Sequence, residues 1–124
     1  MFLNLTDFSD EPLQSQISRQ IRAKVLNGEV DAGTMLPSIR KLARDQHVSV
    51  ITVQRAYEAL EREGLISSRR GKGFFVNEIR DKRKKEMSIE KLIDKIRPLL
   101  KVAKEEGLSI EDIFAVIKKV LESK

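Results

Sequence analysis

The sequence predicts a mainly α-helical fold with one small β-hairpin, followed by a C-terminal segment of two further helices. Apolar residues recur at helical spacing in three segments between residues 12 and 64. β-forming residues then flank a basic, glycine-rich turn at residues 69–73. Beyond a charged run at residues 80–86, two more apolar stripes have the helical period.

The first helix is expected to begin after Asp10 and to end before Gly28. Pro12 suits the first helical position, because the N–H that proline lacks would have no partner there. Gly28 can adopt the left-handed conformation that ends many helices. The buried stripe of this helix is expected to consist of Leu13, Ile17, Ile21 and Val25.

A short second helix is predicted from about Ser38 to Gln46. Pro37 favours an extended conformation in the residue before it, and the Ser38 side chain can cap the helix. His47, in the turn that follows, is expected to adopt a left-handed conformation, which histidine tolerates better than most residues. The inward-facing residues are Ile39, Leu42 and Ala43.

The third helix has the clearest boundaries in the sequence. Ser49 is its expected N-cap, and Gly64 is expected to end it, with Leu65 packing back on the last turn. Val48 and Val53 are placed for a hydrophobic staple. The buried stripe, at positions i, i+3, i+4 and i+7, consists of Val53, Ala56, Tyr57 and Leu60.

Two short strands are predicted at residues 65–68 and 74–76, around a turn that holds three cations and two glycines. The order of elements is therefore helix, helix, tight turn, helix and basic hairpin. This is the order of a winged helix-turn-helix, whose last helix can enter the major groove of DNA. We assign residues 1–78 to this domain.

Residues 79–124 are assigned to a separate segment of two helices. The run Arg80–Glu86 is interpreted as a solvated link, since charge runs are usually solvated. Gly107 separates the helices, Ser109 caps the second, and Pro98 is expected to kink or interrupt the first. The first stripe consists of Ile89, Leu92, Ile93, Ile96, Leu99, Leu100 and Ala103, and the second of Ile110, Ile113, Phe114, Ile117, Val120 and Leu121.

This C-terminal segment is too short to enclose a core of its own, so its two apolar stripes need a cover. The simplest cover is the same segment of a second chain, which would give a homodimer with two-fold symmetry. A monomer whose helices fold onto the N-terminal domain is the alternative. The expected interface residues are Leu92, Ile96, Leu99, Ile110, Ile113, Phe114, Ile117, Val120 and Leu121.

The composition argues against catalysis and against a membrane location. With one histidine and no cysteine, the chain has no catalytic triad, no thiol nucleophile and no metal cluster of recognisable spacing. We therefore expect no enzyme activity, no metal and no cofactor. No apolar run approaches the roughly 20 residues of a membrane-spanning helix, and the N-terminus lacks a secretory signal pattern. These features fit a cytoplasmic protein.

The net charge of +5 favours an anionic partner such as DNA. Residues 1–78 carry 11 Lys and Arg against 10 Asp and Glu, so any DNA-binding surface there must be a local patch. Val50 and Ile51 are apolar residues on the outward face of the third helix, where contact with thymine methyl groups would explain them. On the same face, Gln54 can pair with adenine and Arg55 with guanine or a phosphate.

An ordinary solvated surface is the alternative for each of these residues. Both interpretations of Arg40, a DNA contact and a surface charge, stay open on pattern alone. The main expected role of Ser38 is to cap the second helix, although its backbone N–H could also face a phosphate. The basic hairpin turn suits phosphates or the minor groove. The candidate DNA-binding residues are Ser38, Arg40, Ser49, Val50, Ile51, Thr52, Gln54, Arg55, Arg69, Arg70, Gly71 and Lys72.

Three segments together resemble the DNA-binding domain of the GntR family. They are residues 36–43 (LPSIRKLA), 48–66 (VSVITVQRAYEALEREGLI) and 71–76 (GKGFFV). The context of Tyr57 and the short segment after the hairpin resemble the YtrA subfamily. The resemblance implies a dimeric bacterial repressor with a two-helix dimerisation tail, often one that controls a transporter operon.

The resemblance also implies DNA contacts for Arg40, Thr52 and Gly71. Val50 and Gln54 stand where many members have arginine, and His47 replaces the usual turn glycine, so base preference does not transfer. No effector is identified. The segment after the hairpin has no room for the large metabolite-binding domain of bigger members. Any effector is therefore expected at the dimer interface or between the two parts.

These observations favour a sequence-specific regulator that binds double-stranded DNA, most simply a dimeric repressor on a palindromic operator. A protein-interaction adaptor is one alternative, and the basic turn and exposed reading residues count against it. An architectural DNA protein is another, but that role would leave Val50, Ile51 and Gln54 at base-reading positions unexplained.

Overall fold

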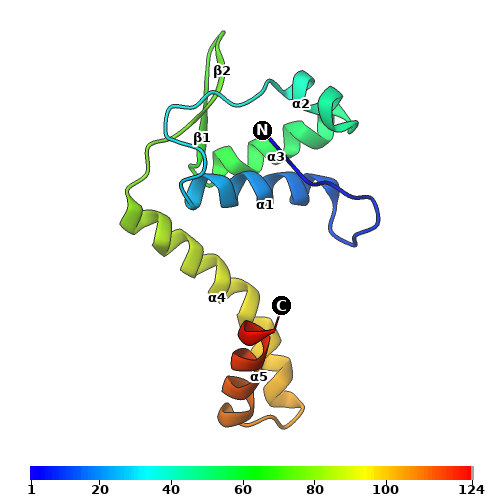
Figure 1. Cartoon of the computed structure of the whole chain (residues 1–124), viewed down its shortest axis with the longest axis vertical. Helices are drawn as coiled ribbons and strands as arrows, with labels where there is room; N and C mark the ends of the chain where they lie inside the picture. Colours follow the sequence, from blue (N-terminus) through cyan, green and yellow to red (C-terminus); the bar gives the residue numbers. More distant parts are fainter. Residues whose placement is uncertain (124) are drawn as a thin grey trace. The chain divides into compact units, whose positions relative to one another are not determined.

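The computed structural model describes residues 1–123, which form two compact units, Met1–Lys84 and a second unit that begins at Lys85. The boundary between the units lies slightly after the predicted division at residue 78. The N-terminal unit contains three helices and one antiparallel hairpin in the predicted order (Figure 1). Its elements are α1 (Leu13–Leu26), α2 (Ile39–Gln46), α3 (Val50–Arg62), β1 (Ile66–Arg69) and β2 (Gly73–Val76).

Residues 1–12 form an N-terminal arm that glutamine side chains hold along α1. Gln20 Oε1 accepts from the backbone N–H of Asn4 at 2.7 Å, and Gln20 Nε2 donates to the Asn4 carbonyl at 2.7 Å. Gln16 makes the same pair of bonds with Thr6, at 3.0 and 2.8 Å, and is buried. The two side-chain amides thus make the backbone hydrogen bonds that a neighbouring strand would otherwise make with the arm. Pro12 is the N-cap of α1 and not, as predicted, its first helical residue.

The helix-turn-helix forms with both predicted caps in place. Ser38 Oγ accepts a hydrogen bond from the backbone N–H of Lys41 at 3.1 Å, and Ser49 Oγ accepts from that of Thr52 at 3.1 Å. His47 has a φ angle of 56°, the left-handed conformation expected of it. Because this residue ends α2 in a left-handed turn, α3 can start after only two more residues.

The predicted stripes of the three helices supply most of the core of the N-terminal unit. The third helix, α3, packs against both α1 and α2. Leu13 and Ile39 are only half-buried, because each lies in the first turn of its helix at the edge of the core. The buried members of the stripes are Ile17, Ile21, Val25, Leu42, Ala43, Val53, Ala56, Tyr57 and Leu60.

The hairpin, which we call the wing, pairs β1 with β2 in the antiparallel register Ile66↔Val76 to Arg69↔Gly73. Relative to the prediction, β1 is shifted by one residue toward the turn, and β2 begins one residue earlier with the same end. Leu65 belongs instead to the end of α3, where its backbone N–H donates to the Leu60 carbonyl at 3.0 Å. Gly64 has a φ angle of 81°, so the predicted glycine ending of α3 is confirmed.

A segment without a predicted strand covers the outer edge of β2. The N–H of Gly33 donates to the Val76 carbonyl at 2.8 Å, and the N–H of Val76 donates to the Thr34 carbonyl at 2.9 Å. The N–H of Leu36 donates to the Phe74 carbonyl at 2.9 Å. The base of the wing is therefore fixed on this side by backbone hydrogen bonds.

The helix α4 (Asp81–Glu105) includes residues 81–86 of the charged run. These residues are helical because lysine, arginine and glutamate are good helix formers, and most of them are exposed, as expected of a solvated run. Asp81 lies in the first turn, where the helix dipole favours a negative charge. Pro98 lies inside α4, so the helix is not interrupted there. A proline removes only one backbone donor, and the turns on both sides keep theirs.

The helix α5 (Ile110–Glu122) starts with the predicted cap. Gly107 has a φ angle of 90° and separates it from α4. Ser109 Oγ accepts from the N–H of Asp112 at 3.1 Å, and Asp112 Oδ2 accepts from the N–H of Ser109 at 2.9 Å. The bond from the Ser109 backbone N–H favours the ionised carboxylate and holds the pKa of Asp112 below its usual value. A capping box therefore fixes the start of α5.

Both predicted stripes of the C-terminal unit are largely exposed in the single chain. Phe114 is 67 % exposed and Leu121 79 %, values unusual for large apolar side chains that recur on one helix face. Ile96 and Ile113 are half-buried. The exposed members are Ile89, Leu92, Ile93, Leu99, Ile110, Phe114, Ile117, Val120 and Leu121.

Candidate nucleic-acid interface

The start of α3 presents apolar residues to solvent. Val50 is 44 % exposed and Ile51 49 % exposed, although burial would stabilise both. They lie in the first turn directly after the Ser49 cap, while Val53 of the same turn is fully buried. The predicted outward face therefore exists, and it combines apolar groups with the positive end of the helix dipole.

Thr52 differs from the other members of this face, because it is half-buried and its hydroxyl is already engaged. Its Oγ1 lies 2.6 Å from Ser49 Oγ, and either hydroxyl can be the donor. The sequence indicated the Ser49 cap but not this second bond. The pair holds two hydroxyl groups together at the N-terminus of α3, where a phosphate oxygen could accept from one of them.

Gln54 and Arg55 are both exposed on the second turn of α3. Gln54 Nε2 donates to Glu58 Oε1 at 3.1 Å. Because a carboxylate can only accept, Glu58 selects the orientation of the Gln54 amide, with its nitrogen toward Glu58. The second Nε2 hydrogen and Oε1 remain available, and these are the two groups with which glutamine recognises adenine.

Arg40 is exposed in the first turn of α2, directly after the Ser38 cap. Nζ of its neighbour Lys41 lies 2.8 Å from Asp45 Oδ2, so this second cation of the turn is already engaged in an ion pair. The positively charged N-terminus of α2 and the Arg40 guanidinium together suit a phosphate oxygen.

Tyr57 connects α3 to the segment before α2 and to the wing. Its hydroxyl donates to the Pro37 carbonyl at 2.7 Å, and its ring meets Phe74 edge-on with centroids 5.1 Å apart. Burial raises the pKa of Tyr57 above its usual value, so the hydroxyl keeps its proton and remains a donor. The sequence predicted a buried Tyr57 but gave no signal for these partners. Through them α2, α3 and the wing belong to one packed unit.

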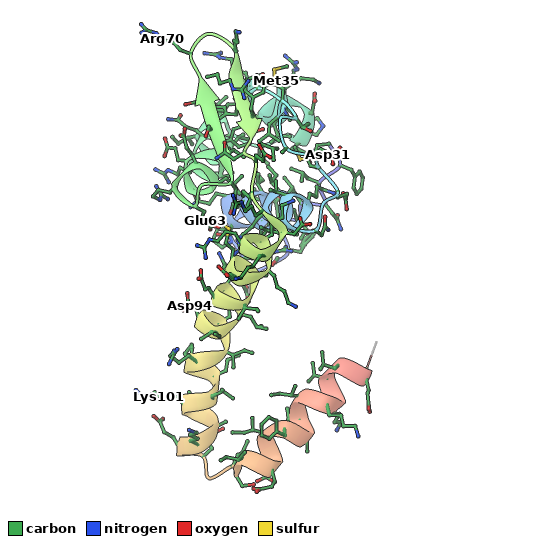
Figure 2. The ribbon with its side chains drawn as sticks, turned by 90° about the vertical axis from the view of Figure 1, so that its left-hand side faces the viewer. Asp31, Met35, Glu63, Arg70, Asp94 and Lys101 are labelled. Atoms are coloured by element: carbon green, nitrogen blue, oxygen red, sulfur yellow. The ribbon has the colours of Figure 1, made fainter. Side chains whose placement is uncertain are left out.

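The wing carries its cations at and beside the turn. The guanidinium of Arg69 lies over the ring of Phe75, 4.3 Å from the centroid, so this arginine is held at the strand end. Arg70 and Lys72 are exposed at the tip, where Figure 2 shows Arg70 at the end of the hairpin. Gly71 between them has a φ angle of 74°, which glycine adopts without strain.

Within residues 1–123, no group of three or more His, Cys, Asp or Glu side chains could hold a metal ion. The helices of the same range include none that is both long and apolar enough to span a membrane.

Comparison with known proteins gives the family. The model of "Bacterial regulatory proteins, gntR family" matches residues 13–76, from the start of α1 to the end of β2. The HTH-type transcriptional regulator YhcF of Bacillus subtilis is 35 % identical over 89 % of this chain and 90 % of its own length. The HTH-type transcriptional repressor YtrA of the same organism is 31 % identical over 90 % of this chain and 86 % of its own.

A solved structure extends the similarity to the whole fold. A GntR family transcriptional regulator from Listeria monocytogenes has a TM-score of 0.72 and 31 % sequence identity, and the alignment covers 93 % of this chain and 98 % of that one. The relatives therefore match both the winged helix-turn-helix and the two helices after it. The chain belongs to the GntR family of DNA-binding transcriptional regulators, with relatives of the YtrA type, and this family is not one of enzymes.

Proposed function

We infer that the chain binds a specific operator as a homodimer and represses transcription. The observation that carries this proposal is the exposed face of α3, on which Val50 and Ile51 stand beside Gln54. A solvated helix rarely exposes apolar residues in its first turn without a partner. Major-groove base edges supply both kinds of partner, a methyl group on thymine and paired donors and acceptors on adenine.

The remaining candidate residues have the chemistry of backbone contacts. Arg40, with the capped start of α2, is suited to fix the protein on a phosphate. Arg70 and Lys72 at the wing tip can reach a second stretch of backbone or the minor groove, with Gly71 allowing close approach. Because these contacts do not distinguish base sequence, we assign discrimination to α3 alone.

The C-terminal unit is proposed to form the dimer. Its two stripes remain exposed in the single chain, and a second copy offers an identical apolar surface. Residues 1–78 would then bind DNA, and residues 79–124 would form the dimer. A two-fold dimer presents two copies of α3 to DNA, so the operator would be a palindrome.

Repression is proposed because the relative YtrA is a transcriptional repressor. Control of a transporter operon rests on the family resemblance alone. A regulator of chromosomal genes acts where bacterial DNA lies, so the cytoplasm is the proposed location. No effector is proposed.

The experiment is selection of binding sites from random double-stranded DNA with the purified full chain. We expect an inverted repeat whose half-sites are enriched in A·T pairs at the positions that α3 contacts. Lys101→Ala, a change on exposed α4, is the control and should select the same sites. Selection of no sequence would overturn a specific operator, and a single non-repeated motif would overturn binding as a symmetric dimer.

A further inference from the structure

The wing is held differently along its two edges. Backbone groups of residues 33–36 cover the outer edge of β2, whereas the side chain of Glu61 on α3 meets the outer edge of β1. Glu61 Oε2 accepts from the backbone N–H of Ser68 at 3.1 Å and from Ser68 Oγ at 3.0 Å. The same carboxylate oxygen thus receives two hydrogen bonds from one residue of the wing.

The position of Ser68 gives these bonds their effect. In an antiparallel pair, alternate residues direct their N–H groups away from the partner strand, so the Ser68 N–H would otherwise face solvent. Ser68 directly precedes Arg69, at the end of β1 nearest the tip. On β2, the register partner of Ser68 is Phe74, which Tyr57 and the N–H of Leu36 contact. The other hydrogen bonds of β1 and its flanks with side chains lie nearer the base of the wing. Asn77 Nδ2 donates to the Gly64 carbonyl at 2.8 Å, and Ser67 Oγ donates to Asn77 Oδ1 at 2.7 Å.

We propose that Glu61 is a positioning residue, which fixes the angle between α3 and the wing so that both reach DNA at once. The proposal rests on the proposed function, in which α3 enters the major groove and the wing tip contacts the backbone. A hairpin held only along β2 could twist about that strand, and the cations that follow β1 would then have to be ordered on binding. Glu61 removes that freedom before DNA arrives.

The negative charge of Glu61 supports this role. A carboxylate on the helix that approaches DNA repels phosphates, so it brings no direct benefit to binding. Charge-assisted hydrogen bonds from N–H and O–H donors are stronger than neutral ones, which explains a glutamate at this position. The structural benefit and the electrostatic cost can be separated, because glutamine keeps the acceptor oxygen and loses the charge.

The test compares Glu61→Gln with Glu61→Ala in the full chain. Both variants remove one negative charge, but only glutamine can still accept from Ser68. On the selected operator, we expect Glu61→Ala to bind about 2- to 10-fold more weakly than Glu61→Gln, the range of one net hydrogen bond. The slope of log affinity against log salt should fall by about 1–2 in Glu61→Ala only, as wing–phosphate contacts are lost.

A second measurement does not depend on DNA. Hydrogen exchange of the Ser68 amide should accelerate in Glu61→Ala and stay slow in Glu61→Gln, while amides of the α3 core keep their protection. Glu78→Gln and Glu78→Ala form the control pair, because Glu78 is an exposed glutamate beyond the wing. The two control variants should bind DNA equally well.

The Arg70→Ala, Lys72→Ala background identifies the route of the effect. If Glu61 acts through the wing, the affinity difference between its alanine and glutamine variants should disappear there. A difference that persists would overturn the proposal, as would equal affinities in the otherwise unchanged protein. If the background itself binds DNA normally, the wing contact fails, and the role of Glu61 fails with it. Unchanged site selection in that case would leave the rest of the proposed function standing.

Discussion

The hydroxyl of Tyr57 is a small group that helps to hold α2, α3 and the wing in one arrangement. It lies in the core, and its acceptor is the carbonyl of Pro37, directly before the cap of α2. Since the ring also meets Phe74 of the wing, one side chain touches all three parts of the proposed interface. A change that removes only the hydroxyl tests this connection without disturbing the ring.

Tyr57→Phe should lower the free energy of unfolding by about 1–2 kcal/mol, because a buried carbonyl loses its donor while the aromatic contact remains. Urea unfolding at fixed protein concentration measures the change, and concentration must be fixed because association shifts the apparent stability. Ala59→Ser, a half-buried change on the same helix, serves as the comparison. An unchanged unfolding midpoint in Tyr57→Phe would show that water replaces the hydroxyl without cost.

Gln54→Ala should reduce discrimination by about 1–3 kcal/mol at particular base pairs, because the paired donor and acceptor for adenine are lost. Affinities for single-base variants of the operator measure this. Arg40→Ala is the matched comparison, and it should weaken operator and unrelated DNA alike, as expected for a phosphate contact. Base preference that survives in Gln54→Ala would exclude Gln54 from the reading residues.

The residues that cap helices or form the core could be predicted from the sequence, whereas the residues whose side chains join distant segments could not. Ser38, Ser49 and His47 act within a few positions of themselves, so local sequence carries the signal. Gln16 and Glu61 bind partners that only the folded chain brings close. A polar residue on a helix is expected in solvent, and nothing in its own surroundings distinguishes these two.

Among the elements, α1, α2 and α3 could be predicted because their apolar periods and end signals agree. The strand-like pairing of residues 33–36 could not, since that segment has no run of β-forming residues. It pairs because the edge of β2 offers unsatisfied backbone groups. The helical conformation of the charged run at the start of α4 was not predicted either, since a run without an apolar face does not distinguish an exposed helix from an irregular link.

The apolar face of α5 gives the prediction that belongs to this scale. Replacing both Ile113 and Ile117 with aspartate should yield monomers, because four buried carboxylates at a two-fold interface would lose their hydration. Sedimentation of the full chain measures the mass. Ala115→Asp with Lys118→Gln makes the same change in net charge at exposed positions and should remain dimeric. A dimer that survives the isoleucine changes would place the interface elsewhere.

At the scale of the whole molecule, a dimer reads the distance between half-sites as well as their sequence. Its two copies of α3 should lie on one side of the duplex, about one helical turn apart. Inserting five base pairs at the centre of the operator rotates one half-site to the opposite side, and affinity should fall steeply. Inserting ten base pairs returns that half-site to its original side of the duplex. Gel-shift titration of the three operators measures the effect, and the monomeric variant should be indifferent to the insertions.

If the exposed stripes of α4 and α5 form the dimer, they also determine how the protein responds to its own abundance. If DNA is bound by pairs of chains, operator occupancy at low expression rises with the square of chain concentration. A twofold increase in synthesis then gives close to a fourfold increase in bound operator until dimers predominate. The same apolar surface that a single chain leaves uncovered would thus set a threshold, below which the controlled genes remain on.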